Sequence, residues 1–300
     1  MESTTKKKVD VYEIITNKII KMLEQGVPPW RKTWGQQAFA QNYESGHIYT
    51  GVNWFLLNLV APYTQPYYLT WAQVKKMEGS IKKGAKAEYV YFYKSFYKDK
   101  DGNTISEKDA HFSSYDESEL DHVRFLKSYK IFNIESVDGI EWHLPTPELR
   151  LNSPIEECEI VLKSMAKQPK FISEDAYRAF YRPKDDVINI PSITSFETAS
   201  HFYNTVFHEI IHWTGAVNRL NRNAFQKAIN RIGEEYAEEE LIAELGACYL
   251  CGYTGIDRTQ ILENNAAYLQ SWINRLKEDT KMIFRVAPKA QKAVGFVLGI

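Results

Sequence analysis

Two histidines and a glutamate within residues 205–217 have the spacing of a metal-dependent hydrolase. His208, Glu209 and His212 form an HExxH motif. Because residues four apart lie on one face of an α-helix, one turn apart, both imidazoles can bind the same ion. Glu209 is offset from that line, so its carboxylate can contact a water beside the ion without being a ligand. The motif therefore predicts metal ligands at His208 and His212 and a general base at Glu209.

The residues around the motif predict that its helix is buried. Apolar side chains occur nearly all round this helix. The polar residues fall on one stripe, which consists of His201, Thr205, His208 and His212. Buried imidazoles need hydrogen-bond partners or a metal ion. The alternative to a metal centre is therefore a pair of core histidines that neighbouring side chains satisfy.

A second predicted helix, at residues 234–252, supplies a carboxylate for the same ion. Glu240 and Glu244 are four residues apart and continue into an apolar run, where ionised carboxylates are costly unless they meet a cation or donors. Two imidazoles leave a catalytic zinc one protein ligand short, and glutamate is a standard third ligand. We assign Glu240 as that ligand and Glu244 as the acceptor of a hydrogen bond from a ligating histidine. The reverse assignment remains open, because the spacing fits either residue.

The remaining glutamates of this helix have a different interpretation. An acidic first turn suits a helix N-terminus and is normally solvated. We therefore interpret as a solvated acidic face the residues Glu234, Glu235, Glu238 and Glu239.

The chemistry that these residues predict is hydrolysis of a peptide bond. A zinc ion on His208, His212 and Glu240 would lower the pKa of a bound water toward ~7 and polarise the scissile carbonyl. Glu209 would take the proton of that water and return it to the leaving amine. A structural zinc usually has four protein ligands, whereas three are found here, so an open catalytic site is favoured. The residues that could help to stabilise the oxyanion, although a structural role is more typical of them, are His201 and Tyr236.

Composition and charge restrict the class of protein. The chain has 300 residues and a formal net charge of -1, with 44% hydrophobic and 25% charged residues. It is expected to be a cytoplasmic globular protein of one large or two ordinary domains, because the sequence shows neither a signal peptide nor a membrane span. Three cysteines predict no disulfide framework, and Cys248 and Cys251 are interpreted as small buried residues. A nearly neutral chain has no global positive field, so any surface for nucleic acid must be local.

Such a local surface is predicted in the first third of the chain. Residues 18–98 contain eleven Lys and Arg but four Asp and Glu, with aromatic residues among the cations. Cations can follow the phosphates of single-stranded DNA while rings stack on its bases, at about 1–3 kcal/mol per base. The alternative is that the tryptophans belong to the core and the lysines only increase solubility. The candidate DNA contacts are Trp30, Arg31, Lys32, Trp34, Tyr43, Tyr49, Trp54, Lys82, Lys83 and Lys86.

Helices and strands alternate irregularly along the chain, which predicts an α+β fold. Periodicity predicts helices at residues 9–25, 55–60, 69–77, 154–167, 234–252 and 261–281, and strands at 89–96, 126–133 and 186–191. The last strand precedes the HExxH helix and is expected to be the sheet edge that a peptide substrate joins. Residues 99–121 carry eight acidic and two basic residues without periodicity and are interpreted as a mobile loop. A boundary between domains at residues 1–145 and 150–300 is marked by Pro145, Pro147 and Pro154.

The chain resembles a known two-domain family. The pieces similar to the N-terminal domain of ArdC-type antirestriction proteins are residues 26–34 (GVPPWRKTW), 41–57, 68–93 and 127–140. The pieces similar to the zincin-like metallopeptidase domain usually fused to it are residues 185–191, 207–222 (FHEIIHWTGAVNRLNR), 236–256 and 271–284. The resemblance implies that the first domain binds single-stranded DNA, that the second holds a zinc-type site, and that the protein protects the DNA of mobile elements from restriction. No individual DNA contact follows from it, and no function is carried onto residues 99–121.

Three functions are compatible with these features. In the first, the protein binds single-stranded DNA and cleaves a protein bound to that DNA, such as a restriction subunit. In the second, it is a passive DNA coat whose zinc only stabilises the fold. In the third, it is a free peptidase whose first domain binds protein. An intact Glu209 favours the first function, because a structural site does not need a base.

Overall fold

The computed structural model describes residues 10–25, 39–105, 120–144, 154–222, 234–256 and 266–300. Packing divides the chain into two compact units. The helical unit consists of Met1–Tyr67 together with Glu141–Ile300, and the ribbon unit consists of Tyr68–Ile140. The mixture of helices and strands confirms the predicted α+β class. In the part of the chain that the structure describes, no helix has the length and apolar character needed to cross a membrane.

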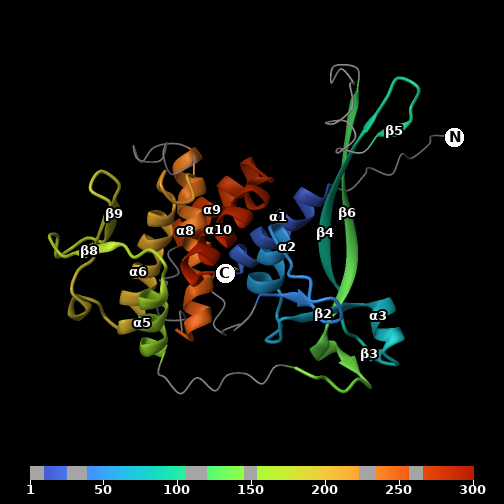
Figure 1. Ribbon diagram of the computed structural model, residues 1–300, viewed down its shortest axis with the longest axis horizontal. Helices are drawn as coiled ribbons and strands as arrows, with labels where there is room; N and C mark the ends of the chain where they lie inside the picture. The colour runs from blue at the N-terminus through green and yellow to red at the C-terminus, as the bar shows by residue number, and fades with distance from the viewer. Residues whose placement is uncertain (1–9, 26–38, 106–119, 145–153, 223–233, 257–265) are drawn as a thin grey trace. The chain divides into compact units, whose positions relative to one another are not determined.

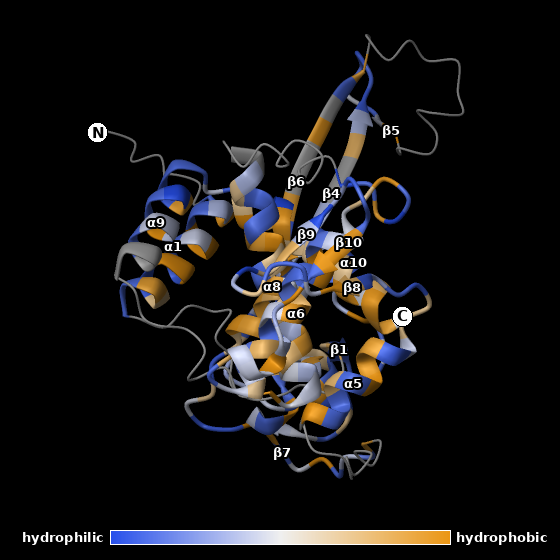
Figure 2. Ribbon diagram, turned by 90° about the vertical axis from the view of Figure 1, so that its left-hand side faces the viewer, coloured by the Kyte–Doolittle hydropathy of each residue, from blue (hydrophilic) through white to orange (hydrophobic). Residues whose placement is uncertain are grey.

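Helices make up most of the helical unit (Figure 1). They are α1 (Val11–Glu24), α2 (Val52–Phe55) with the π-helical turn η2 (Leu56–Val60), α5 (Pro154–Ser164), α6 (Ala199–Thr214), α8 (Glu234–Thr254), α9 (Ala266–Glu278) and α10 (Met282–Leu298). Helices α6, α8 and α10 pack against one another, and hydrophobic residues concentrate along them (orange in Figure 2). The Thr198 side chain caps the start of α6 by accepting a hydrogen bond from the His201 N–H, and α6 ends at Gly215. The whole HExxH motif therefore lies within one helix.

Helices α6 and α8 approach each other closely at Gly246. A Cβ atom at this position would lie 2.7 Å from the side chain of Ile211, which is closer than van der Waals contact allows. Glycine thus lets α8 come against α6 next to His212. The two cysteines of α8, Cys248 and Cys251, are buried as predicted. Apolar packing of α8 therefore sets its position against the HExxH helix.

Segments from the start of the chain complete the core of this unit. Helix α1 packs on α9, where the Thr16 hydroxyl donates to the carbonyl oxygen of Thr280 at 2.8 Å. Helix α2 packs on α10, where the Gly51 N–H donates to Oε1 of Gln291 at 2.9 Å. Packing thus joins the first 67 residues to the C-terminal half, whereas the sequence predicts a division near residue 145. Residues 145–153, which contain that predicted boundary, lie outside the described residues.

A small sheet lies beside α6. Its strands, in the order β8-β10-β9, are β8 (Lys170–Ile172), β10 (Val187–Asn189) and β9 (Phe180–Arg182). Strand β10 pairs in parallel with β8 and antiparallel with β9. The prediction that residues 186–191 form the sheet edge is wrong, because β10 is central and its Ile188 is fully buried. Strand β9, which contacts α6, is an edge strand of this sheet instead.

Short elements surround two long strands in the ribbon unit. Its elements are β2 (Tyr67–Thr70), α3 (Trp71–Lys76), β3 (Ser80–Ile81), β4 (Glu88–Lys98), β5 (Thr104–Ile105), β6 (Asp121–Asn133), η4 (Ile134–Ser136) and β7 (Val137–Asp138). Thr70 and Gln73 form a capping box that starts α3. The strands β2, β6, β4 and β5 follow one another in that order. Elsewhere in the chain, β1 (Gln41–Asn42) and η5 (Ile193–Ser195) are short.

Strands β4 and β6 form a long antiparallel ribbon (Figure 1). Their register runs from Glu88 opposite Ile131 to Lys98 opposite Asp121. Both strands extend beyond their predicted ends, and β5 adds a short strand to β4 within the segment interpreted as a loop. Cross-strand pairing therefore orders polar residues that carry no apolar signal of their own. Residues 106–119 of the same segment lie outside the described residues.

Candidate functional site

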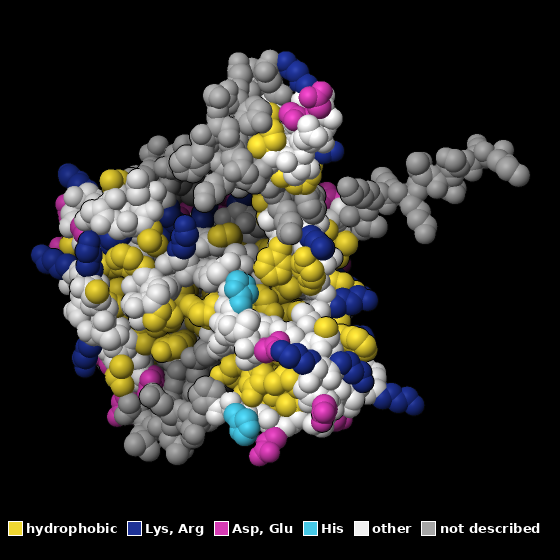
Figure 3. Space-filling view, turned by 45° about the vertical axis from the view of Figure 1, so that its right-hand side comes forward, with side chains coloured by type: hydrophobic (Ala, Val, Ile, Leu, Met, Phe, Trp, Pro, Cys, Tyr) yellow, Lys and Arg dark blue, Asp and Glu magenta, His cyan; other side chains and the backbone are white. Residues whose placement is uncertain are grey.

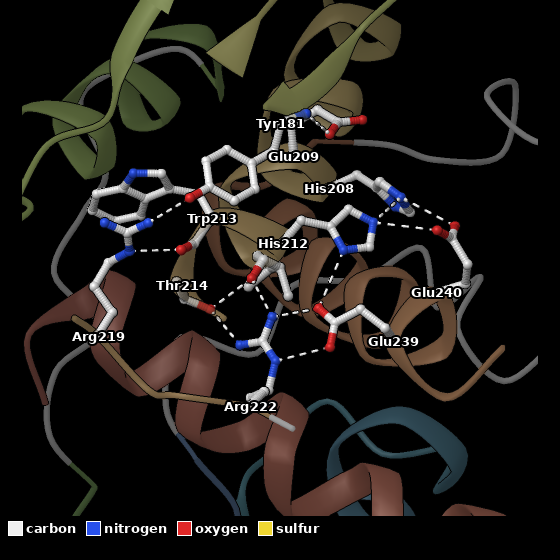
Figure 4. Close-up of polar contacts among 11 residues, drawn as sticks. Tyr181, His208, Glu209, His212, Trp213, Thr214, Arg219, Arg222, Glu239 and Glu240 are labelled. Carbon is white, nitrogen blue, oxygen red and sulfur yellow. Dashed lines mark hydrogen bonds and ion pairs between the residues drawn. The ribbon is translucent and has the colours of Figure 1, made fainter. Parts of the chain in front are cut away.

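Three of the predicted metal-binding residues lie together in the helical unit (Figure 4). Nε2 of His208 and Nε2 of His212, one turn apart on α6, are 3.1 Å from each other. The carboxylate of Glu240, near the start of α8, lies 3.6 Å from His208 Nε2 and 3.5 Å from His212 Nε2. One donor atom from each residue can be chosen so that all three lie within 4.8 Å of one another. The helix pair thus brings two imidazoles and one carboxylate to a single point.

These distances fit a divalent metal ion. Bonds of about 2.0–2.1 Å at tetrahedral angles place two ligand atoms about 3.3–3.4 Å apart, and the observed separations of 3.1, 3.5 and 3.6 Å lie around that value. All three side chains are partly exposed to solvent, which is typical of a site that keeps a position for water or substrate. A divalent metal bound here would supply a Lewis acid and an activated water.

His208 and Glu240 stabilise each other's charged forms. Burial alone would lower the pKa of His208, but a hydrogen bond with Glu240 and the charges of three nearby glutamates, including Glu244, raise it to about 9. Burial would raise the pKa of Glu240, but hydrogen bonding to His208 and the charges of both histidines lower it to about 2. Tyr236 also donates a hydrogen bond to Glu240, which places this oxyanion candidate beside the carboxylate. A metal ion would take the place of the proton in this arrangement.

Glu239 contradicts its interpretation as part of a solvated face. Its side chain is 1% exposed, and its Oε1 lies 3.2 Å from Nδ1 of His212. Burial would raise the pKa of Glu239, but hydrogen bonds and charges from His212 and Arg222 hold it below its usual value. Because successive residues are about 100° apart on a helix, Glu239 and Glu240 can both face α6. Glu239 therefore has, on His212, the orienting contact that the sequence analysis assigned to Glu244.

Arg222 holds Glu239 in place. Its guanidinium donates to Oε2 and Oε1 of Glu239 at 3.0 and 2.5 Å. It also donates to the Thr214 hydroxyl at 2.6 Å and to the Ile211 carbonyl at 2.7 Å, both at the end of α6. Arg222 is buried, so every one of these contacts is shielded from water. Sequence reasoning missed this residue, because arginines are usually exposed and its partners come from two other segments.

The predicted base, Glu209, faces the edge strand β9. Its carboxylate is buried and its Oε2 accepts a hydrogen bond from the Tyr181 N–H at 2.8 Å. Figure 4 shows the carboxylate beside Tyr181, on the same helix as the two histidines. The outward side of β9 therefore lies directly against the residue that would move a proton.

Arg219 fixes β9 against the end of α6. Its guanidinium lies 3.9 Å from the ring centroid of Trp213 and donates to the Trp213 carbonyl at 2.6 Å. It also donates to both carboxylate oxygens of Asp186, at 2.9 and 2.6 Å, and to the Tyr181 hydroxyl at 2.9 Å. The hydrogen bond from Arg219 lowers the pKa of Asp186 despite partial burial. Because Tyr181 also contacts Glu209 through its backbone, Arg219 indirectly holds the strand that orients the base.

His201 lies at the start of α6, away from these contacts. Its Nδ1 is 2.7 Å from the Thr198 hydroxyl and its Nε2 is 3.9 Å from Glu197. Both partners belong to the segment that caps the helix, almost two turns before His208. This position agrees with the structural role that is more typical of such a histidine.

The predicted DNA contacts are distributed over several environments. Trp30, Arg31, Lys32 and Trp34 lie outside the described residues. Lys82, Lys83 and Lys86 are exposed in the turn that follows β3 and precedes β4, and Nζ of Lys82 donates to the Glu135 carbonyl at 2.8 Å. Nζ of Lys82 also lies 3.7 Å from the Asp138 carboxylate, so the charge of this basic turn is partly compensated within the ribbon unit.

The aromatic candidates of residues 43–54 are less accessible. Tyr43 is half-buried, with its ring 5.1 Å from that of Trp142 and its hydroxyl accepting from the His143 N–H. Tyr49 is buried, and Trp54 is fully buried against Tyr249 of α8. A base cannot stack on a ring whose faces are enclosed, so in this structure Tyr49 and Trp54 act as core residues. Their burial corrects the interpretation of these two positions.

Other aromatic residues are exposed in the ribbon unit. They are Trp71 of α3, Tyr89 and Tyr93 of β4, and Tyr129 of β6. A lysine ammonium lies over the ring of Trp71, of Tyr89 and of Tyr129, at 5.9, 5.9 and 5.0 Å from the centroid. Hydrophobic and tyrosine side chains (yellow) with Lys and Arg (dark blue) among them are visible in the space-filling view (Figure 3). Tyr89 and Tyr93 belong to the aromatic residues of segment 89–96, which the sequence analysis used only to predict a strand.

Two family models match the chain in the predicted order. The N-terminal domain of the anti-restriction factor ArdC matches residues 9–132, and a zincin-like metallopeptidase matches residues 160–289. Two solved structures of the antirestriction ArdC protein from the R388 plasmid are similar to the chain. The metal-free one has 30% sequence identity and a TM-score of 0.70, and the match covers 96% of this chain and 97% of that one. The Mn(II)-bound one has 29% identity and a TM-score of 0.66, with 97% and 98% covered.

Relatives of known sequence include longer proteins. Two DNA primases TraC of Escherichia coli are each 30% identical, and this chain spans 20% and 27% of their lengths. The uncharacterized protein y4eC of Sinorhizobium fredii (strain NBRC 101917 / NGR234) is 29% identical, and the match covers 97% of this chain and 92% of that protein. Because identity to the ArdC structure reaches 30% over almost its entire length, these findings establish the family. The chain belongs to the ArdC antirestriction family, with an ArdC-type N-terminal domain and a zincin-like metallopeptidase domain.

Proposed function

We propose that this protein binds single-stranded DNA and hydrolyses peptide bonds at a zinc centre held by His208, His212 and Glu240. The observation that carries the proposal is the position of Glu209, a buried carboxylate on the helix of the two histidines and against the edge strand β9. A metal that only stabilised the fold would not need a carboxylate in this place. Membership of an antirestriction family supports DNA as the setting of the reaction.

Each of these residues has a task in the proposed reaction. The bound metal supplies Lewis acidity and lowers the pKa of water. Glu209 accepts a proton from the attacking water and returns it to the leaving amine. Glu239, held by Arg222, fixes the orientation of the His212 ring.

Strand β9 is the surface that we assign to the peptide substrate. It is an edge strand, and a peptide that adds to the sheet along it would take the Tyr181 N–H that now binds Glu209. The Tyr181 N–H points out of β9 to Glu209, so a peptide bound there passes next to the base. Arg219 limits the movement of β9 through its contacts with Asp186 and Tyr181. The structure thus supports a protein substrate that presents an extended segment.

Zinc is the proposed metal because two imidazoles and a carboxylate are a typical catalytic zinc set. The Mn(II)-bound ArdC structure makes manganese the competitor to test. Elemental analysis of the purified chain should find about one zinc per chain, because the three donors form one site. Reconstitution of chelated protein with each metal, followed by a cleavage assay, would identify the active ion.

The replacement Glu209→Gln tests the enzyme. Cleavage of denatured casein, with and without a single-stranded oligonucleotide, should fall at least ~10²-fold, the low end of what a general base contributes. Bound metal and DNA affinity should stay near wild type, because the amide keeps the shape of the side chain. Glu197→Gln is the matched control, since Glu197 precedes the same helix and its side chain is 86% exposed. Equal cleavage by Glu209→Gln and wild type would refute Glu209 as the base.

A passive DNA coat is the competing outcome. Restriction of incoming DNA should be measured in cells that contain wild type, Glu209→Gln, or the double variant Trp30→Ala/Trp34→Ala. If Glu209→Gln protects DNA fully while the tryptophan variant fails, proteolysis has no part in protection. If Glu209→Gln fails although it still binds single strands, the cleavage of a protein on DNA, such as a restriction subunit, is required.

A further inference from the structure

The β4–β6 ribbon presents a repeated aromatic face. Directly opposed residues of antiparallel strands share a face, and residues two apart on one strand do as well. The register therefore places Tyr89, Tyr91 and Tyr93 of β4 on one face, with Lys130 opposite Tyr89. Tyr89 is 43% exposed and Tyr93 is 56% exposed, while Tyr91 is half-buried. Large rings are rarely left this accessible in a row without a partner.

The opposite face of the same ribbon repeats the combination. Tyr129 of β6 is opposite Val90, and Lys127 is opposite Phe92. The rings of Tyr129 and Phe92 are 5.6 Å apart, and Lys127 Nζ lies 5.0 Å from the Tyr129 centroid. Both faces therefore present a ring with an ammonium group next to it.

The local charge favours an anionic partner. The central segments of the two strands, residues 89–93 (YVYFY) and 126–130 (LKSYK), contain two lysines and no aspartate or glutamate. Lys130 and Lys127 are both exposed at the protein surface. An apolar protein surface would not require lysines beside the tyrosines, whereas a chain of phosphates with bases attached uses both kinds of group.

The spacing favours a single strand over a duplex. At about 3.4 Å per residue, the two exposed rings of this face, Tyr89 and Tyr93, are four residues and about 13.6 Å apart. Stacked bases in duplex DNA are about 3.4 Å apart along each strand. Successive bases can meet successive rings only if they separate from each other, which a single strand does easily and a paired duplex does not.

We propose that the β4–β6 ribbon is the surface on which bases of single-stranded DNA stack, with Tyr89 and Tyr93 as the stacking rings and Lys130, on the same face, as a phosphate contact. This inference rests on the proposed single-strand binding and specifies where it occurs. It assigns to the ribbon a role that the sequence analysis gave to Tyr49 and Trp54, which are buried. Recognition through ring faces predicts little preference for base sequence.

The first experiment uses the full-length double variant Tyr89→Thr/Tyr93→Thr. Threonine keeps the β propensity of the strand and removes both rings. The dissociation constant for oligo-dT, measured by fluorescence anisotropy, should increase at least tenfold, because each stacked base contributes substantially. The conservative variant Tyr89→Phe/Tyr93→Phe should bind like wild type, since the rings remain. Tyr177→Thr is the matched control, because Tyr177 is 94% exposed in the helical unit.

An abasic oligonucleotide separates stacking from charge. Wild type should bind this strand of sugar and phosphate more weakly than oligo-dT, and the threonine variant should bind both strands equally. The variant Lys130→Gln should reduce the slope of log affinity against log salt by about 0.7, the value for one lost phosphate contact, whereas Lys127→Gln on the opposite face should leave it unchanged. Lys163→Gln/Lys184→Gln, at exposed positions of the helical unit, should leave the slope unchanged.

The results separate two possible failures. Either the ribbon is not the binding site, or the protein does not bind single-stranded DNA at all. If wild type does not bind oligo-dT, the proposed single-strand binding itself fails. If wild type, Tyr89→Thr/Tyr93→Thr and Lys130→Gln bind equally well and with the same salt slope, the ribbon is not the site and the proposed function stands. Sedimentation of each variant gives a further check, because loss of a dimer in the threonine variant would assign the ribbon to self-association. If the threonine variant does not fold, the other variants still test the location. The phenylalanine variant should keep the affinity of wild type, and the Lys130→Gln variant should have a smaller salt slope.

Discussion

The metal centre and the β4–β6 ribbon use opposite arrangements of similar chemical groups. At the metal centre, Glu239 and Arg222 are buried and each charged group has several fixed partners. On the ribbon, Tyr93 and Lys130 are exposed. Fixed, shielded groups suit a reaction in which small displacements reduce the rate. Exposed rings and flexible cations suit a polymer that must be held regardless of its sequence.

The comparison implies different responses to substitution. A change in a buried network leaves other charges without partners, so it affects stability and metal binding together. A change on the exposed ribbon should affect binding of DNA and leave folding nearly unchanged. The following predictions test this difference, beginning with the largest effect.

Arg222→Met should reduce the free energy of unfolding by about 3–5 kcal/mol, because it leaves the Glu239 carboxylate buried without its cation. Urea denaturation of chelated protein measures the change. The double variant Arg222→Met/Glu239→Gln should recover much of the loss, since no buried charge then remains unpaired. Arg285→Met is the control, because the ion pair of Arg285 with Glu238 is partly exposed and should contribute less than about 1 kcal/mol. A loss at Arg222 no larger than at Arg285 would contradict the buried network.

Metal affinity should rise with pH between about 6.5 and 9. The pKa of His208 is raised from 6.5 to about 9 in the metal-free fold, so a metal must displace a proton over this range. Loss of one proton gives up to about tenfold in affinity per pH unit, with a plateau above the raised pKa. The stability of the metal-free protein should instead decrease as pH rises over this range. Its His208–Glu240 pair stabilises it fully between about pH 4.5 and 6.5, and that contribution disappears as pH rises through about 9 or falls toward about 2.

Competition with a chelating dye from pH 6 to pH 10, together with thermal unfolding of chelated protein, measures both trends. Glu240→Gln should flatten the pH dependence of metal-free stability, because it removes the hydrogen-bonding carboxylate that raises the pKa of His208. Affinity that stays constant over this range would show that no proton is displaced.

Gly246→Ala should destabilise the helical unit by about 1–3 kcal/mol, because the added Cβ overlaps Ile211 of α6. The same overlap would move α8 away from α6, so metal affinity should fall as well. The second change Ile211→Val removes part of the overlapping side chain and should restore some of the stability. Calorimetry and metal titration test both effects, and a fully stable Gly246→Ala would contradict the close approach of the two helices.

Tyr89→Thr/Tyr93→Thr should change the free energy of unfolding least, by about 0.5–1 kcal/mol, because both rings are exposed. Tyr68→Thr is the contrast, since Tyr68 of β2 is fully buried and should cost about 3 kcal/mol or more. Denaturation of the full chain measures both. A large loss for the exposed pair would mean that these rings are part of a core.

Features that depend on local sequence were predicted better than features that depend on packing between distant segments. The family, the α+β class and the helix that contains His208 and His212 follow from sequence, because a four-residue spacing on one helix is set by the backbone alone. Which face of α8 turns to α6 is decided by close packing at Gly246, so Glu239 was misread as solvated. The burial of Trp54 depends on Tyr249, almost two hundred residues later in the chain.

Sheet position was equally hard to predict. Residues 186–191 read correctly as a strand, but whether β10 is central or at the edge depends on β8 and β9, whose short segments have weak periodicity. The long ends of β4 and β6 are polar and form because each strand pairs with the other. The sequence also does not show which aromatic rings are accessible to DNA. Tyr49 is enclosed, whereas Tyr93 is exposed despite a similar local sequence signal.

The packing of α2 on α10 and of α1 on α9 has a consequence for how the chain is made. A ribosome adds about 5–20 residues per second, so α2 is finished roughly 12–49 s before α10 is complete. During that time the apolar faces of α1 and α2 have no native partner, and they are candidates for chaperone binding. The helical unit can close only after synthesis of its last helix. The HExxH centre would therefore become able to bind metal only after α10 has been synthesised.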